Sequence, residues 1–177
     1  MDKHSAMARL IGLRREHEVS FFDMPLKELV NKVLFVGDKC IRHDVIVRLI
    51  AVECYMRTGE TGELYEKLQK RRMATLAKGR YLAYDLTRFP QLIENFSEIG
   101  FDEETPIIVD TNEKIIEGAH RLACCIYFEI DTVPMEMWSD TEAGLEDTEW
   151  FAKNFTEEEN NVIARRREEI RTRFCEA

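Results

Sequence analysis

The segment IIEGAHRLACCIYF, residues 115–128, places acidic and basic side chains between two apolar stretches. Glu117, His120 and Arg121 lie close together there, with Gly118 among them. A surface loop would not need such apolar flanks, and a plain core segment would not need these polar side chains. The pattern predicts a strand that ends at Glu117 and a helix that begins near Ala119.

This predicted strand–helix step has the chemistry of an anion site. The first turn of a helix has unpaired N–H groups at a positive dipole end, and Gly118 permits a sharp turn and close approach to the backbone. The forked guanidinium of Arg121 suits phosphate oxygens, and His120 adds a further donor. Since the dipole disfavours a cation at this end by about 0.3–1 kcal/mol, a bound anion would reverse that cost.

Two roles for Glu117 are open at this point. The carboxylate could orient His120 or Arg121, or it could accept a proton from a substrate hydroxyl. A purely structural alternative is an ion pair between Glu117 and Arg121, with His120 as a surface imidazole. The local pattern is less specific than a Walker motif, so the residues alone do not choose between these alternatives.

Short, β-branched segments on both sides of the motif predict the elements that position it. PIIVD (106–110), KIIEG (114–118) and TVPMEM (132–137) predict strands, with a turn at 111–113. A helix over 119–128 would bury Leu122, Ala123, Cys125 and Ile126. Further helices are predicted over 25–36, 43–57, 63–77, 90–100 and 156–174, and Thr156 and Glu159 fit a capping box at the start of the last one. The fold class is therefore α+β, with a small mixed sheet.

The segment PIIVDTNEKIIEGAHRLACCIYFEIDTVPMEM resembles the core of the ParB/sulfiredoxin superfamily. The likeness covers about residues 106–138, with a looser extension back to residue 81. It implies a ParB/sulfiredoxin-like core over 81–138, preceded by a helical region over 1–80 and followed by an acidic loop and a helix over 139–177. By this resemblance, Gly118, Ala119, His120 and Arg121 would bind nucleotide phosphates, and Glu117 would replace the usual aspartate.

Departures from the superfamily narrow the expected function. Sulfiredoxins carry a nucleophilic cysteine where this chain has Ala119, and Cys124 and Cys125 lie a turn deeper, where we expect core packing. Partition CTPases resemble Gly-x-Arg-Arg at the step, whereas His120 replaces the first of those arginines here. In those CTPases a basic DNA-binding domain also follows the core, whereas the helical region precedes the core here and the chain is acidic. Sulfiredoxin chemistry and a DNA clamp are therefore both disfavoured.

The remaining resemblance is to the free serine kinases, which implies a small-molecule hydroxyl kinase using ATP or another nucleoside triphosphate with Mg²⁺. Lys78 and Arg80 would assist at the phosphates, and Glu117 or Asp85 would orient the acceptor hydroxyl. Two alternatives stay open. One is a nucleotide-sensing or partner-binding domain without catalysis, and the other is a nuclease or nucleic-acid-binding module.

Composition bears on these alternatives. The net charge of −9 and the pI near 5.1 argue against a general nucleic-acid binder, because neutralising phosphates requires a basic face. Residues 67–80 hold six cations and no acid, which predicts either a solvated helix face or an anion-binding patch. Five scattered cysteines, no membrane-spanning run and no signal-peptide pattern predict a cytoplasmic protein with reduced thiols. The scattered histidines and cysteines do not form a zinc motif.

Overall fold

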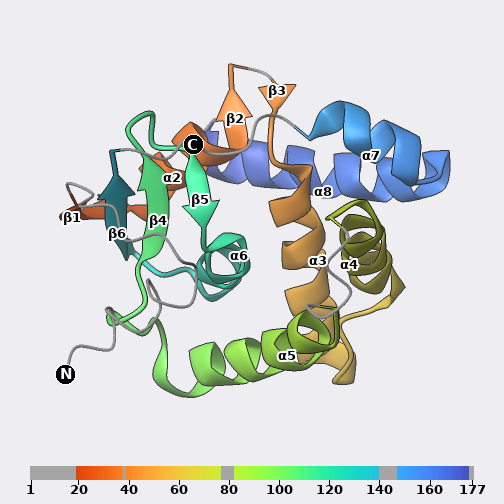
Figure 1. Ribbon diagram of the computed structural model, residues 1–177, viewed down its shortest axis with the longest axis horizontal. Coiled ribbons are helices and arrows are strands. Elements are labelled where there is room, and N and C mark those ends of the chain that lie inside the picture. The colour runs from red at the N-terminus through yellow and green to blue at the C-terminus, as the bar shows by residue number, and fades with distance from the viewer. Residues whose placement is uncertain (1–18, 38, 77–81, 140–146, 176–177) are drawn as a thin grey trace.

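The computed structural model describes residues 19–37, 39–76, 82–139 and 147–175; for 73–76 and 82–85 the description extends to the backbone only. Within these ranges the chain is an α+β protein, in which a mixed sheet lies to one side and most helices to the other (Figure 1). The predicted α+β class and mixed sheet are therefore confirmed.

The main sheet has four strands in the order β1-β6-β4-β5. They are β1 (Val19–Pro25), β6 (Thr132–Trp138), β4 (Ile107–Asp110) and β5 (Ile115–Glu117). The central pair β4–β6 is parallel, and both outer pairs are antiparallel. The three strands predicted between residues 106 and 137 are confirmed. Strand β1, which pairs with β6 along seven residues, was not predicted and lies within the region expected to be helical.

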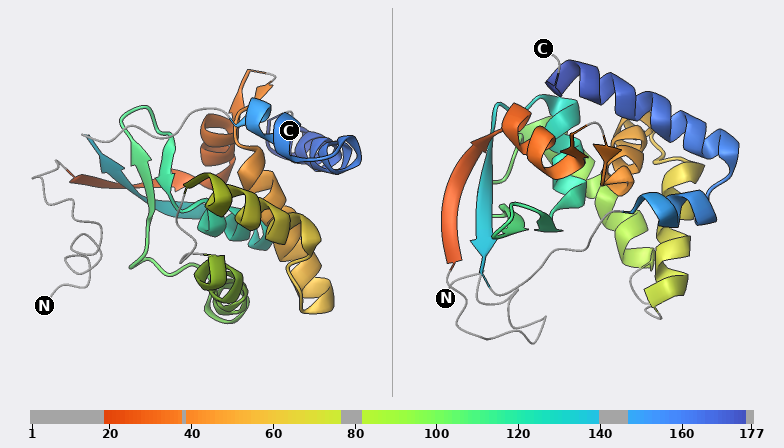
Figure 2. Two further views of the ribbon diagram at one scale, coloured as in Figure 1. Left: turned by 45° about the vertical axis from the view of Figure 1, so that its right-hand side comes forward. Right: turned by 90° about the horizontal axis from the view of Figure 1, so that it is seen from above.

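The described helices are α2 (Leu26–Leu34), α3 (His43–Thr58), α4 (Glu63–Leu76), α5 (Leu82–Ile99), α6 (Ala119–Phe128), α7 (Thr148–Asn154) and α8 (Glu157–Cys175). Helix α6 packs between the sheet and α3 (Figure 1). Its residues Leu122, Ala123, Cys124, Cys125 and Ile126 are all buried. Helix α8 runs beside α2 and α3 (Figure 2, right).

Two helices differ from their predicted bounds. The helix predicted over 25–36 ends at Leu34, because Phe35–Val36 forms β2 and pairs with β3 (Lys39–Cys40) in a small hairpin. Helix α5 begins at Leu82, so Pro90 lies inside the helix instead of opening it. The inward face continues through the proline, since buried Phe89, Ile93 and Phe96 follow a helical period.

The last helix begins as its sequence predicts. The Thr156 N–H donates to Glu159 Oε2 (2.6 Å), and the Glu159 N–H donates to Thr156 Oγ1 (3.2 Å). This reciprocal pair is a capping box, in which each side chain satisfies an otherwise unpaired backbone donor. Phe151 and Phe155 stack before it at a ring distance of 4.8 Å and are buried, so the aromatic residues anchor α7 and α8 to the body.

Candidate functional site

Gly118 joins β5 to α6, as the sequence predicts, with φ of +111°. A Cβ atom at this position would lie 3.1 Å from side-chain carbons of Ile107 in β4. The structure therefore requires glycine here for two reasons, a left-handed backbone and close contact with the neighbouring strand. The sequence predicts a close approach to the backbone at Gly118, and strand β4 of the same sheet makes that approach.

A cavity of about 530 Å³ opens beside this step. The step contributes Glu117, Gly118, His120 and Arg121, while the opposite wall comes from α5, which includes Arg88. The α5–β4 connection adds further lining residues, Gly100, Asp102 and Thr105. The volume falls within the range of small-molecule sites. Residues predicted from one short motif thus share a single cavity with an arginine from another helix.

Arg121 lies half-buried at the cavity, and its guanidinium donates to the Pro106 carbonyl (2.9 Å). Burial lowers the pKa of Arg121, and the Glu117 carboxylate opposes that shift. The side chain remains a cation, because guanidinium groups do not lose a proton in folded proteins. Its Nε atom is buried without a hydrogen-bond partner. Arg121 is therefore hydrogen-bonded to Pro106 instead of being paired with Glu117 as the structural alternative predicts, and its Nε donor has no partner among the described residues.

His120 has a different environment from its neighbour. Its Nε2 atom lies 2.8 Å from the Tyr65 hydroxyl of α4, and the Phe89 ring of α5 packs against it with centroids 4.5 Å apart. Burial lowers the pKa of His120 well below its ordinary value, and the positive charge of Arg48 adds to that effect. His120 is consequently neutral at neutral pH. The expected second donor carries no charge, and the positive charge of the step comes from Arg121.

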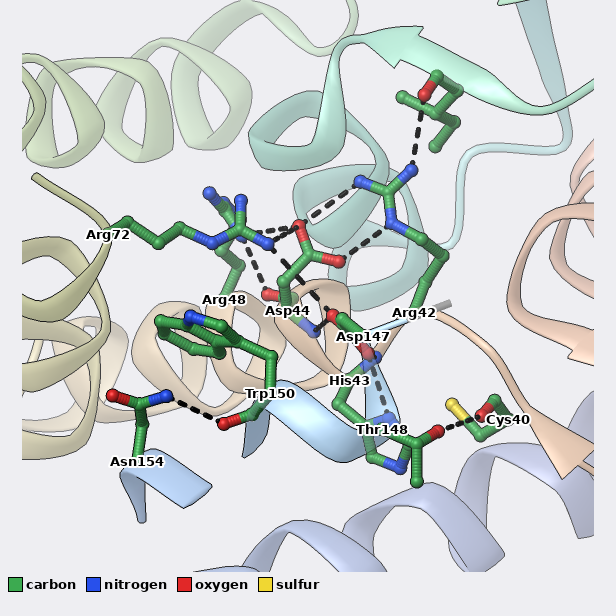
Figure 3. A network of polar contacts seen from close by, with 11 residues as sticks. Cys40, Arg42, His43, Asp44, Arg48, Arg72, Asp147, Thr148, Trp150 and Asn154 are labelled. Carbon is green, nitrogen blue, oxygen red and sulfur yellow. Dashed lines mark hydrogen bonds and ion pairs between the residues drawn. The ribbon is translucent and has the colours of Figure 1, made fainter. Parts of the chain in front are cut away.

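A network of buried charges lies at the start of α3 (Figure 3), and its residues Arg48 and Asp44 act electrostatically on His120. The Asp44 carboxylate is fully buried and accepts hydrogen bonds from Arg42 (2.8 Å) and Arg48 (2.8 Å). Arg72 of α4 lies 3.4 Å from the same carboxylate. Although burial opposes ionisation, the charges of Arg42 and Arg48 hold the pKa of Asp44 well below its usual range.

Asp147 connects this network to the C-terminal elements. Its carboxylate accepts the backbone N–H groups of His43 (2.8 Å) and Asp44 (2.9 Å) at the start of α3. Those groups would otherwise be unpaired at the positive end of the helix. Arg42 also donates to the Ile115 carbonyl of β5 (3.2 Å), so the same cluster touches the strand that leads into the step.

Sequence reasoning missed this network and Tyr65. The sequence of residues 43–57 predicts a buried helix that is apolar nearly all round. Asp44 and Arg48 are four residues apart in that apolar sequence, a spacing that places both side chains on one helix face. A charged pair inside a buried helix is a usable signal, because unpaired charges are almost never fully buried.

The other predicted site residues have separate outcomes. Ala119 is the first residue of α6 and is half-buried. Asp85 lies in α5, where only the backbone is described, and Lys78 and Arg80 lie outside the described residues. Within the described part of the cationic run, Lys67 pairs with Glu159 (2.6 Å), Lys70 with Glu66 (3.1 Å) and Arg72 with Asp44 (3.4 Å), so these cations have protein carboxylates as partners.

Cys124 and Cys125 are fully buried in α6, which confirms their interpretation as core residues. Burial raises the pKa of both thiols above their ordinary value. The reactive thiolate is therefore disfavoured at both positions.

No helix in the described part of the chain is both long and apolar enough to cross a membrane. Comparisons of the chain with known protein families, with curated proteins and with solved structures found no match.

Proposed function

We propose that the protein binds a nucleoside triphosphate by its phosphates in the cavity beside Gly118 and transfers a phosphoryl group to a small hydroxyl compound. The observation that carries the proposal is the shared cavity. Glu117, His120 and Arg121 from the strand–helix step meet Arg88 from α5 around a volume of about 530 Å³. The resemblance of residues 106–138 to the ParB/sulfiredoxin superfamily supports the same location for the phosphates.

The residues at the cavity fit an anionic ligand. Arg121 has a buried Nε donor without a partner, and Arg88 faces the cavity from an exposed position on α5. Two arginines suit the oxygens of a polyphosphate, because each guanidinium presents several donors in one plane. The backbone N–H groups at the start of α6 add donors where the helix dipole favours negative charge.

Glu117 is the proposed partner of the acceptor hydroxyl. It ends β5 and lines the cavity beside Arg121, where its carboxylate would orient the hydroxyl and receive its proton. Bound Mg²⁺ would neutralise phosphate charge. In the described part of the chain, no group of three or more acidic, histidine or cysteine side chains could hold a metal ion. The ion would be held by the phosphates and the Asp102 carboxylate, as Mg²⁺ commonly is at nucleotide sites.

Binding is tested by isothermal titration calorimetry with ATP, GTP, CTP, UTP and inorganic triphosphate, each with Mg²⁺. We expect at least one nucleotide to bind, and Arg88→Ala to weaken its affinity about 10- to 100-fold through the lost charge-assisted hydrogen bonds. Stability should change little, since Arg88 is exposed. Arg165→Ala is the matched control, because it removes an exposed arginine of α8 that does not line the cavity.

Turnover separates a kinase from a binding domain. A panel of hydroxyl compounds is incubated with the bound nucleotide, and formation of nucleoside diphosphate is followed. Glu117→Gln should leave the dissociation constant within about twofold and reduce turnover at least 100-fold, because general-base assistance contributes about 10²–10⁴. Nucleotide binding without turnover on any acceptor would favour the nucleotide-sensing alternative. Tight binding of DNA or RNA without nucleotide binding would contradict the proposal.

A further inference from the structure

Helix α4 contributes one side chain to the surroundings of the cavity through a direct contact with His120. Tyr65 is fully buried, and its hydroxyl oxygen lies 2.8 Å from His120 Nε2. The Phe89 ring packs on both residues, 4.9 Å from the Tyr65 ring and 4.5 Å from the imidazole. Burying a tyrosine hydroxyl is costly unless it is hydrogen-bonded, so this contact also fixes the orientation of the imidazole.

Each ring nitrogen of His120 can take part in a hydrogen bond. The Nε2 edge is occupied by Tyr65, while the residue as a whole lines the cavity. Among the described residues, Nδ1 has no hydrogen-bond partner. The charged groups that act on the ring are Arg48 and Asp44 of α3, Arg72 of α4 and Arg121 of α6, and burial together with the arginines disfavours protonation.

We infer that Tyr65 is a positioning residue of the cavity: it fixes the Nε2 edge of His120 so that the Nδ1 edge meets the bound phosphate or acceptor hydroxyl. This inference rests on the proposed function. It extends the site to α4, which lies outside the segment that resembles the superfamily. A neutral imidazole has one N–H and one lone pair, and the hydrogen bond at one nitrogen determines which of the two the other nitrogen presents.

A double-mutant cycle tests whether Tyr65 acts through His120. The dissociation constant of Mg²⁺–ATP is measured for wild type, Tyr65→Phe, His120→Ala and the double variant. We expect Tyr65→Phe to weaken binding about tenfold in wild type and less than twofold in the His120→Ala background, because contacting residues are not additive. Tyr55→Phe is the control, since it removes a hydroxyl that donates to Glu94 (2.5 Å) away from the cavity. That control should bind as wild type.

Two results of the cycle would overturn the inference. Equal losses from Tyr65→Phe in both backgrounds would mean that Tyr65 supports the fold and does not act through His120. An unchanged dissociation constant for Tyr65→Phe, alongside a loss for His120→Ala, would mean that the ring needs no positioning.

A ligand-free measurement separates this inference from the proposed function. The ring ¹⁵N shifts of His120 should report one neutral tautomer in wild type and a mixture in Tyr65→Phe, because the hydrogen bond at Nε2 fixes the tautomer. Identical shifts in the two proteins would refute the contact even if ATP binds. Failure of ATP, GTP, CTP and UTP to bind wild type would instead overturn the proposed function, and with it the role of the Nδ1 edge.

Discussion

His120 and Arg121 are neighbours in sequence, but their side chains have different partners and different charge. Arg121 reaches Pro106 and stays a cation, whereas His120 contacts Tyr65 and is neutral. The helix dipole disfavours a cation at the start of α6, and the structure reduces this cost by keeping one of the two side chains uncharged. Arg121 therefore carries the positive charge of the step, and the nearby carboxylates of Glu117 and Asp102 act favourably on it.

The state of His120 predicts how stability depends on pH. Its pKa in the folded protein is below the unfolded value of about 6.5, so the unfolded chain binds more protons as pH falls. The free energy of unfolding should therefore decrease from pH 6.5 toward pH 5, with a contribution from His120 of at most about 1.4 kcal/mol per pH unit.

Urea unfolding at several pH values measures this dependence, and the comparison of wild type with His120→Gln isolates the contribution of one residue. The variant should show a shallower slope between pH 6.5 and pH 5. Asp44 does not interfere in this window, because its lowered pKa affects stability only below about pH 5. Equal slopes in the two proteins would show that His120 is protonated normally in the folded state.

Among the elements, the packing of α6 against β4 sets the geometry of the site. The turn at Gly118 brings the first residues of α6 against β4, and Arg121 then reaches back to Pro106, just before that strand. Helix α5 forms the opposite wall of the cavity. A small displacement of α6 from β4 would therefore move His120 and Arg121 relative to Glu117 and Arg88.

Gly118→Ala should destabilise the protein by about 2–4 kcal/mol, because it combines an unfavourable φ of +111° with a Cβ 3.1 Å from Ile107. Gly59→Ala is the matched control. Its φ is also positive, at +80°, but nothing lies within 4 Å of the added Cβ, so we expect about 1 kcal/mol. Chemical denaturation of both variants gives the difference. Equal costs would indicate that backbone strain alone, without the contact to β4, makes glycine necessary.

At the scale of the whole molecule, contacts across long sequence separations join the region before residue 81 to the core. Strand β1 forms an edge of the sheet through β6, and α3 packs on α6. Asp147, from the C-terminal part, accepts the first N–H groups of α3. Residues 106–138 are therefore enclosed by elements from both ends of the chain.

We expect residues 81–138 expressed alone not to fold cooperatively. The fragment would lose β1 from the sheet edge and α3 from the buried face of α6, which exposes Leu122 and Ile126. Circular dichroism and urea titration of the fragment and the full chain provide the measurement. A single cooperative transition for the full chain is expected, and a sigmoidal unfolding curve for the fragment would contradict this view of the fold.

Four features could be predicted from the sequence alone: the α+β class, the three strands around the motif, the start of α6 and the capping box of α8. These features depend on local periodicity, on Gly118 and on hydrogen bonds between residues that are near in sequence. The strands and helices of the motif could be predicted because each is encoded by adjacent residues.

Three features follow from the folded chain and not from local sequence: β1 completes the sheet, α5 and the strand–helix step share a cavity, and His120 is neutral beside Tyr65. Each of these depends on groups far apart in the chain, such as the 55 residues that separate Tyr65 from His120. Burial and neighbouring charge set the pKa of a side chain, and neither is encoded in the adjacent sequence. For that reason the motif alone predicted His120 and Arg121 as two side-chain donors, and the fold decides that one is a cation and the other a neutral ring.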